Sequence, residues 1–214
     1  MKKSFKHISA TVAMATIVLS TGAIAGPVAP ISYTFDQPTS CGTWCYPDAT
    51  FSKLTDGVVG QAGWAVNAGS EWVGWAYTQQ INIDFSFASI SSIGSVSIGS
   101  TQDNLGDVAL PSFTVSAFES GYWVLKGTLT NPPSSANDNS PTNGVPHSFY
   151  TLSNLGILSD QVRVWVLVNG PWSFVDEVQF NASVTAVPEP ESYAMLLAGL
   201  GLMAGVVRRR NKSL

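Results

Sequence analysis

Apolar and polar side chains alternate without a break through residues 81–87, which read Ile81-Asn82-Ile83-Asp84-Phe85-Ser86-Phe87. Successive side chains of a β-strand point to opposite faces, so the isoleucines and phenylalanines share one face and the polar residues share the other. A related period of two occurs in Val162-Arg163-Val164-Trp165-Val166-Leu167-Val168, where valine occupies every second position against Arg163, Trp165 and Leu167. Both segments are therefore predicted to be half-buried strands, with Arg163 and Trp165 on the outward face.

Seven further segments are rich in β-branched and aromatic residues and are also predicted to be strands. Glycine, asparagine, aspartate and serine residues that favour turns separate them, and residues 131–146 are expected to form a surface loop. Some nine strands joined by turns and loops predict an all-β fold, a two-sheet antiparallel β-sandwich of the jelly-roll type. The seven segments are Ile31–Phe35, Trp72–Thr78, Ser95–Gly99, Phe113–Phe118, Tyr122–Leu129, Ser148–Leu152 and Ser173–Val184.

The N-terminal residues have the composition of a secretory signal peptide. Lys2, Lys3 and Lys6 precede an apolar run that ends in the small-residue motif Ala23-Ile24-Ala25. Cleavage after Ala25 is expected, and an uncleaved N-terminal anchor is the alternative. Residues 1–25 are therefore assigned to export, and residues 26–186, about 160 residues, to one exported domain.

Residues 187–214 combine three features in order. Pro188-Glu189-Pro190 ends regular structure, because proline fixes φ and lacks a backbone N–H group. Residues 193–207 are uncharged, and as a helix they would reach about 22 Å, which is short of the roughly 30 Å hydrocarbon core of a bilayer. Arg208, Arg209 and Arg210 follow and are expected to hold that end in the cytoplasm.

This order of proline box, short apolar helix and basic cluster resembles the PEP-CTERM sorting signal of exported Gram-negative bacterial proteins. The resemblance implies recognition and cleavage near Pro188–Pro190 by an exosortase-type membrane enzyme. Membrane contact is then expected only through the C-terminal segment and only before cleavage, after which the protein goes to the cell surface or extracellular matrix. An ordinary C-terminal anchor is the alternative.

The exported domain is strongly acidic. Its only basic side chains are Lys53, Lys126 and Arg163, against twelve acidic ones, which gives a formal charge of −9. Nucleic acid is excluded as an expected partner, because phosphate binding needs clustered lysine and arginine.

Two cysteines lie four positions apart in Cys41-Gly42-Thr43-Trp44-Cys45. Export makes a Cys41–Cys45 disulfide the expected state. Closing so short a loop stabilises the fold by only about 2 kcal/mol in the chain-entropy model, so its expected effect is to fix the loop around Trp44. A redox or metal-binding dithiol is disfavoured, because His147 is the only histidine in the exported domain.

Several segments, taken in order, resemble the galactose-binding-like or discoidin-type β-sandwich, which includes many bacterial carbohydrate-binding modules. The resemblance implies a calcium ion held where the Leu-Thr-Asp-Gly turn meets the late Asp-Glu-Val segment. Carried over, the ligands are Asp56, Glu177 and the main-chain carbonyl of Lys53, and the ion is structural. The alternative is that Asp56 only caps its own turn and that Glu177 is a solvated acid at the end of a strand. The matching segments are 53–57, 72–75, 81–85, 110–116, 163–166 and 172–178.

The resemblance also implies that glycan binds in loops, through exposed aromatic side chains. Trp44 and Trp64 are the predicted platforms, because the first lies in the disulfide loop and the second in a glycine-rich stretch. Trp165 and Arg163 share an outward strand face that could cover a neighbouring segment or form a groove. Trp123 and Trp172 are expected in the core or at its edge, and His147 is expected to take no part.

Nothing in the sequence arranges a nucleophile, a base or a catalytic metal, and Gly-x-Ser-x-Gly is absent. The expected function is therefore non-catalytic binding, most simply of a polysaccharide. The alternatives are a structural matrix or biofilm protein with protein partners and, less favoured, a glycan-acting enzyme.

Overall fold

The computed structural model describes residues 25–40, 45–60, 64, 71–78, 80–103, 107–130, 132, 148–184, 195–201 and 203. Residues 25–184 belong to one compact unit, and the C-terminal helical residues belong to a second. Several predictions fall outside the described residues and stay predictions: the signal segment before Ala25, the Cys41–Cys45 disulfide, Trp44, His147, Pro188-Glu189-Pro190, and Arg208, Arg209 and Arg210.

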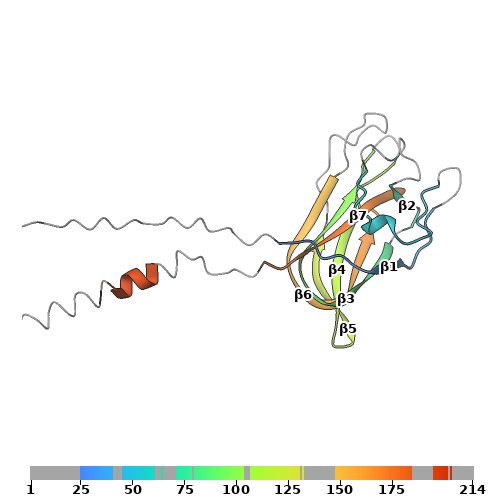
Figure 1. Ribbon diagram of the computed structural model, residues 1–214. Coiled ribbons are helices and arrows are strands. Elements are labelled where there is room, and N and C mark those ends of the chain that lie inside the picture. The colour runs from blue at the N-terminus through green and yellow to red at the C-terminus, as the bar shows by residue number, and fades with distance from the viewer. Residues whose placement is uncertain are drawn as a thin grey trace, which may run out of the picture. The chain divides into compact units, whose positions relative to one another are not determined.

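The described residues of the first unit form antiparallel strands and a short 3₁₀ helix, η1 (Lys53–Thr55). Hydrogen bonding is continuous in the strand order β2-β7-β3-β6-β4-β5, and β1 pairs with β3. Figure 1 shows the strands wrapping around a common interior. The strands are β1 (Ser32–Phe35), β2 (Val73–Ala76), β3 (Gln80–Ser100), β4 (Ser112–Glu119), β5 (Tyr122–Leu129), β6 (Ser148–Leu167) and β7 (Trp172–Ala182).

Two long strands, β3 and β6, pair along their whole length and take part in both layers of the sandwich. Residues 80–86 of β3 and 161–167 of β6 lie with β1, β4 and β5 in what we call the five-stranded sheet. The other halves of β3 and β6 lie with β7 and β2 in the four-stranded sheet. The predicted antiparallel sandwich is therefore confirmed.

All nine predicted strand segments overlap strands, but they form seven strands in the described chain, and the predicted segment 72–78 extends beyond β2 at both ends. The predicted segments 81–87 and 95–99 are the two halves of β3, and segments 148–152 and 162–168 are the two halves of β6. Register shifts between Ser86 and Ser91 and between Ile93 and Ser95 bend the pair, and Gly156 has a φ of +57°. Such irregularities re-aim a strand without ending it.

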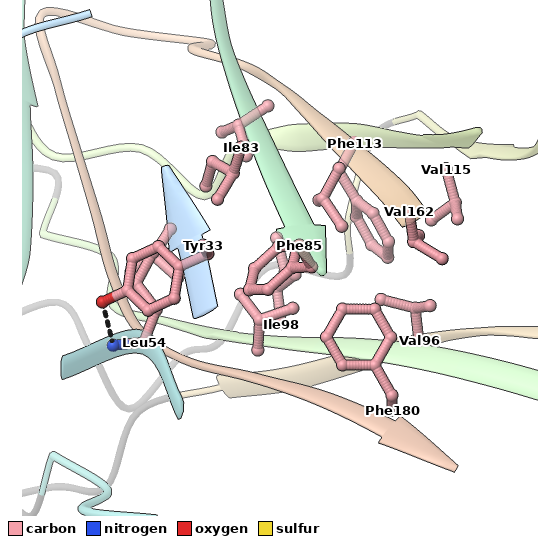
Figure 2. Packing of buried hydrophobic residues seen from close by; sticks show 14 of the residues in the cluster. Tyr33, Leu54, Ile83, Phe85, Val96, Ile98, Phe113, Val115, Val162 and Phe180 are labelled. Carbon is pink, nitrogen blue, oxygen red and sulfur yellow. Dashed lines mark hydrogen bonds between the residues drawn. The ribbon is translucent and has the colours of Figure 1, made fainter. Parts of the chain in front are cut away.

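Inward side chains of the two sheets form the main core. Ile83 and Phe85 from β3 and Phe113 from β4 meet Val96, Ile98 and Phe180 of the four-stranded sheet, and all are at most 2% exposed (Figure 2). Burying each such side chain contributes about 1.5–3 kcal/mol. On β6, Val162, Val164 and Val166 are buried while Arg163 and Trp165 are half-buried, so the predicted alternation is confirmed.

Tyr33 connects this core to η1. Its hydroxyl accepts a hydrogen bond of 2.9 Å from the Leu54 backbone N–H (Figure 2) and donates one to the Asp48 carboxylate. Burial and the Asp48 carboxylate both raise the pKa of Tyr33. The segment that contains the predicted Asp56 turn is thereby fixed against the sandwich.

The first residues of this unit run beside the end of β7. The Ala182 N–H donates to the Gly26 carbonyl and the Val28 N–H to the Phe180 carbonyl, both at 2.8 Å. In the second unit, residues 195–201 and 203 are helical, within the predicted apolar segment. In the part of the chain that the structure describes, no helix is long and apolar enough to span a membrane.

Candidate functional site: the outer face of the five-stranded sheet

Two rows of residues cross the outward face of the five-stranded sheet. In the first row, Trp165 on β6 lies between Asn82 on β3 and Thr114 on β4. In the second row, Arg163 lies between Asp84 on β3 and Ser116 on β4. All six side chains are half-buried. Because cross-strand neighbours on one face are about 5 Å apart, the two rows form one continuous polar and aromatic surface.

Arg163 and Asp84 form a two-pronged ion pair at the centre of this surface. Arg163 Nε donates to Asp84 Oδ1 at 2.6 Å and Nη2 donates to Oδ2 at 2.8 Å. The Asp84 carboxylate raises the pKa of Arg163. The two side chains remain 30% and 38% exposed, so solvent or a ligand can still reach both groups.

Trp123 on β5 joins the same surface. The Arg163 guanidinium carbon lies 4.3 Å from the centre of the Trp123 ring, which is a cation–π geometry. The ring also packs against Phe118 of β4, with centroids 5.3 Å apart. Trp123 is half-buried, and sequence reasoning, which assigned it to the core or its edge, did not place it beside Arg163.

Trp64, a predicted platform, lies in a second aromatic cluster. Its ring stacks on Phe174, with centroids 5.7 Å apart and planes 11° apart, and Phe174 stacks in turn on Trp172. Trp64 Nε1 donates to Asp103 Oδ2 at 3.0 Å. Trp64 is half-buried, and the face of its ring against Phe174 is not accessible to a ligand. Trp172 is half-buried at the edge of the same cluster.

The predicted calcium ligands meet at the loop that follows η1. Asp56 Oδ1 accepts the Val58 N–H at 2.8 Å, so Asp56 caps its own turn. Glu177 Oε2 on β7 accepts the Gly57 N–H at 3.2 Å. The half-buried side chain of Lys53 has its pKa lowered mainly by burial, an effect that Asp48 and Asp56 oppose. Asp56, Glu177 and the Lys53 segment therefore occupy one region.

Asp176 also reaches this loop, although regular alternation along a strand would place it on the opposite face from its neighbour Glu177. Asp176 Oδ2 accepts the Gly60 N–H at 2.7 Å. The register of β7 against β3 shifts at these residues, because Ile98 pairs with Val178 but Ser100 pairs with Val175. This irregularity turns both carboxylates toward residues 57–60, a placement that regular alternation does not predict.

Both carboxylates are more basic than usual. Burial raises the pKa of Asp176 to about 7. Burial, together with the charges of Asp56 and Asp176, raises the pKa of Glu177 to about 7. A cation beside these groups would favour their charged forms.

The donor set suits calcium in kind, because carboxylate and carbonyl oxygens are its preferred ligands. Among the described residues there is no group of three or more His, Cys, Asp or Glu side chains arranged to hold a metal. An ion there would thus depend on main-chain carbonyls, such as that of Lys53, and on water. A pocket of about 390 Å³ lies next to Glu177, lined also by residues 27–30, Thr55 and Phe180.

In the comparison with protein families, residues 186–211 match the PEP-CTERM protein-sorting motif. The chain therefore carries a PEP-CTERM signal, as the sequence resemblance stated, and is an exported protein. The comparison with curated proteins finds no match.

Solved structures with a similar arrangement include carbohydrate-binding modules. The family 32 module of C. perfringens NanJ in complex with galactose has a TM-score of 0.46 and 11% identity, over 74% of this chain and 99% of that one. The C-terminal domain of a chitobiase from Bacteroides fragilis has a TM-score of 0.48 and 11% identity, over 75% and 99%. The family 32 module of AlyQ in complex with 4,5-unsaturated mannuronic acid has a TM-score of 0.44 and 11% identity, over 72% and 97%. Similarity at this level transfers no ligand to this chain.

Proposed function

We propose that the exported domain is a non-catalytic binding protein of the cell envelope or extracellular polysaccharide matrix, and that its ligand is carbohydrate. The observation that carries this proposal is the pair Trp165 and Arg163 on one accessible sheet face. A flat apolar ring next to charged hydrogen-bonding groups matches a sugar, which has apolar C–H faces and a rim of hydroxyls. The galactose-binding-like resemblance of the sequence supports the same ligand class.

Trp44 and Trp64 remain proposed contributors from the loops. For Trp64 only the ring surface that does not lie on Phe174 is available, so its proposed contact is through an edge or one face.

The non-catalytic part of the proposal rests on the chemistry of the acidic residues. Asp176 and Glu177, whose raised pKa values would suit an acid or base, both accept backbone N–H groups of residues 57–60. They therefore anchor a loop, which is a structural task.

The experiment that tests glycan binding uses the exported domain, residues 26–186, on an array of polysaccharides that includes the exopolysaccharide of the producing cell. Binding to at least one polysaccharide that weakens in Trp165→Ala or Trp64→Ala is the expected result. Absence of binding to every polysaccharide would remove the proposal.

We also propose a structural calcium ion at Asp56, Glu177 and the Lys53 carbonyl. Support comes from the position of Glu177 beside the Asp56 turn. Support also comes from the raised pKa of Glu177, because a bound cation would stabilise the ionised form of this carboxylate. Thermal unfolding with excess calcium and with chelator tests it: calcium should raise the Tm of the native chain and leave Glu177→Gln nearly unchanged. Equal Tm values for the native chain in both buffers would end the calcium proposal without affecting glycan binding.

Processing by an exosortase-type enzyme near Pro188–Pro190, followed by release to the cell surface or matrix, completes the proposal. It is supported by the sorting motif at residues 186–211.

The alternative is a structural matrix protein with protein partners, and one observation favours it. The strand β5 pairs with β4 and carries exposed apolar side chains, with Tyr122 at 75% and Leu125 at 64% exposure. Exposed apolar strands of this kind can add to a sheet of another protein. Crosslinking of the secreted protein in its native matrix, with Leu125→Lys as the variant, distinguishes the two functions. The structural role would be favoured if Leu125→Lys loses protein crosslinks that the native protein forms and if the native domain binds no polysaccharide.

A further inference from the structure

We propose that the outer face of the five-stranded sheet is itself the glycan site and that it takes an uncharged polysaccharide chain. The site consists of Trp165 and of the group formed by Trp123, Arg163 and Asp84. This inference rests on the proposed function, because it assumes that the domain binds glycan on the face that carries Trp165 and Arg163, and it adds the residues Trp123 and Asp84 and the class of ligand.

The first argument is the spacing of the aromatic rings. Arg163 and Trp165 are two residues apart on β6, so their Cα atoms are about 7 Å apart on the same face. Trp123 extends from β5 until its ring lies 4.3 Å from the Arg163 guanidinium carbon. The indole rings of Trp165 and Trp123 therefore both border the Arg163–Asp84 ion pair. A polysaccharide chain can contact both rings, whereas a single monosaccharide can contact only one of them.

The second argument is the polar groups between the rings. The Arg163 guanidinium carries five N–H donors, and the Asp84 carboxylate offers several acceptor positions. Their mutual pair uses Nε and Nη2, and both side chains keep about a third of their surface accessible. Thr114 and Ser116 add hydroxyl groups on the neighbouring strand. A donor group beside an acceptor group is what adjacent sugar hydroxyls require, because each hydroxyl both donates and accepts.

The third argument is charge, and it selects the ligand class. Arg163 is neutralised by Asp84, and Lys126 on β5 is neutralised by Glu119 at 2.7 Å. Asp36, which accepts hydrogen bonds from Asn82, adds a negative charge at the β3 side of the face. With a formal charge of −9 on residues 26–186, an acidic polysaccharide would be repelled, whereas an uncharged one would not.

The fourth argument is preorganisation. The ion pair fixes the Arg163 side chain from one side, and the Trp123 ring fixes it from another. The Trp123 ring is in turn held by Phe118. Side chains that are already ordered lose little conformational entropy when a ligand binds, so a shallow surface can bind a polymer with useful affinity.

Affinity electrophoresis tests the inference. The exported domain is run in native gels that contain uncharged polysaccharides (a galactan, a mannan, a β-glucan) or acidic ones (alginate, polygalacturonate). The variants are Trp165→Ala and Trp123→Ala, and the control is Tyr77→Ala, which removes an 84% exposed aromatic ring from a residue that belongs to none of the strands of this face. We expect retardation by at least one uncharged polysaccharide, an affinity at least tenfold lower in both tryptophan variants, and no change in the control.

The variants Trp165→Phe and Trp123→Phe guard against a folding defect, because they keep a ring and should lose less affinity than the alanine variants at an unchanged Tm. If the native domain binds polysaccharide and all four tryptophan variants bind equally well, the position is wrong while the proposed function stands. If only acidic polysaccharides retard the domain, the ligand class is wrong. If none retards it, the inference and the proposed function fail together.

Discussion

Arg163 is fixed by two neighbours of different chemistry, the Asp84 carboxylate and the Trp123 ring. Lysine at this position would keep the charge but lose the two parallel N–H···O bonds and the flat contact with the indole. We expect Arg163→Lys and Asp84→Asn each to lower the free energy of unfolding by about 1 kcal/mol. Their coupling in a double-mutant cycle should be roughly 0.5–1 kcal/mol, because both side chains are about a third exposed and solvent screens the pair.

Urea denaturation of the four proteins of this cycle measures the coupling. The Lys126–Glu119 pair, tested as Lys126→Met and Glu119→Gln, is the matched control, because a lysine cannot form the two-pronged geometry. A coupling at Arg163–Asp84 no larger than that of the control pair would contradict the expectation.

Asp176 makes stability depend on pH. Its pKa is about 7 in the folded protein, against about 3.9 in an unfolded chain. Between these values the folded state holds a proton that the unfolded state has lost, so the free energy of unfolding falls as pH rises from about 4 to about 7. Asp176→Asn removes this titration and keeps an oxygen that can accept the Gly60 N–H. Relative to the native chain, the variant should therefore gain stability on the order of 2 kcal/mol between pH 5 and pH 8.

Urea denaturation at the two pH values, in chelator, measures this gain. A comparison of the variant with the native chain removes the part of the Glu177 contribution that comes from burial and from Asp56, whereas the part that comes from the Asp176 charge is lost in the variant. A native chain that becomes more stable than Asp176→Asn as pH rises would contradict the prediction.

At the scale of strands, alternation in the sequence was enough to find the sheets but not to count their strands. Alternation from Ile81 to Phe87 and from Val162 to Val168 predicted two half-buried strands, and the inward and outward sides of both are confirmed. The alternation is interrupted where β3 and β6 bend, near Ser91 and Gly156, and an interruption of this kind in a sequence resembles a turn. Whether the chain ends its strand there or only bends depends on pairing with the partner strand, which no local pattern records.

The residues of the candidate site likewise fall into those that the sequence predicted and those that it did not. Trp165 and Arg163 were predictable, because both follow from alternation on one strand. Trp123 was not, because its contact with Arg163 depends on the β4–β5 pairing, which shifts register between Val115 and Ser116. The partner of Arg163, Asp84, was visible as a polar residue of its strand, but only the pairing of β3 with β6 shows that the two are opposite.

Strand β2 should tolerate no side chain at Gly74. A Cβ atom there would lie 2.6 Å from a Phe174 ring carbon and 2.9 Å from the Tyr46 Cβ, and both residues are fully buried. We expect Gly74→Ala to lower the free energy of unfolding by about 2–3 kcal/mol. Gly127→Ala on β5 is the control: its Cβ would meet the end of the Leu155 side chain at 2.9 Å, which can move, so the expected cost is about 1 kcal/mol or less.

Urea midpoints for Gly74→Ala and Gly127→Ala check this order. Equal losses in the free energy of unfolding would contradict the prediction. They would mean that Tyr46 and Phe174 can shift to admit a methyl group as readily as the end of the Leu155 side chain can.

At the scale of the whole molecule, the first and last residues of the sandwich are hydrogen-bonded to each other. Gly26, the expected first residue after removal of the signal peptide, bonds to Ala182 at the end of β7. The exported domain therefore contains every strand of its two sheets between the two predicted processing points, and removal of both terminal segments leaves this pairing intact.

The C-terminal segment is then expected to act as a processing signal and not as a lasting anchor. Residues 186–211 match the sorting motif, and the uncharged residues 193–207 are too few for a straight helix to cross about 30 Å of hydrocarbon. Intact-mass measurement of the protein from the extracellular fraction of producing cells should show a chain that begins near Gly26 and lacks residues 193–214. Replacing Pro188 and Glu189 by alanine should leave the tail attached and the protein in the membrane fraction, whereas the control change Ser183→Ala, before the motif, should alter neither. A secreted native protein that retains residues 193–214 would show that the segment is an anchor, and the release step proposed for this protein would have to be abandoned.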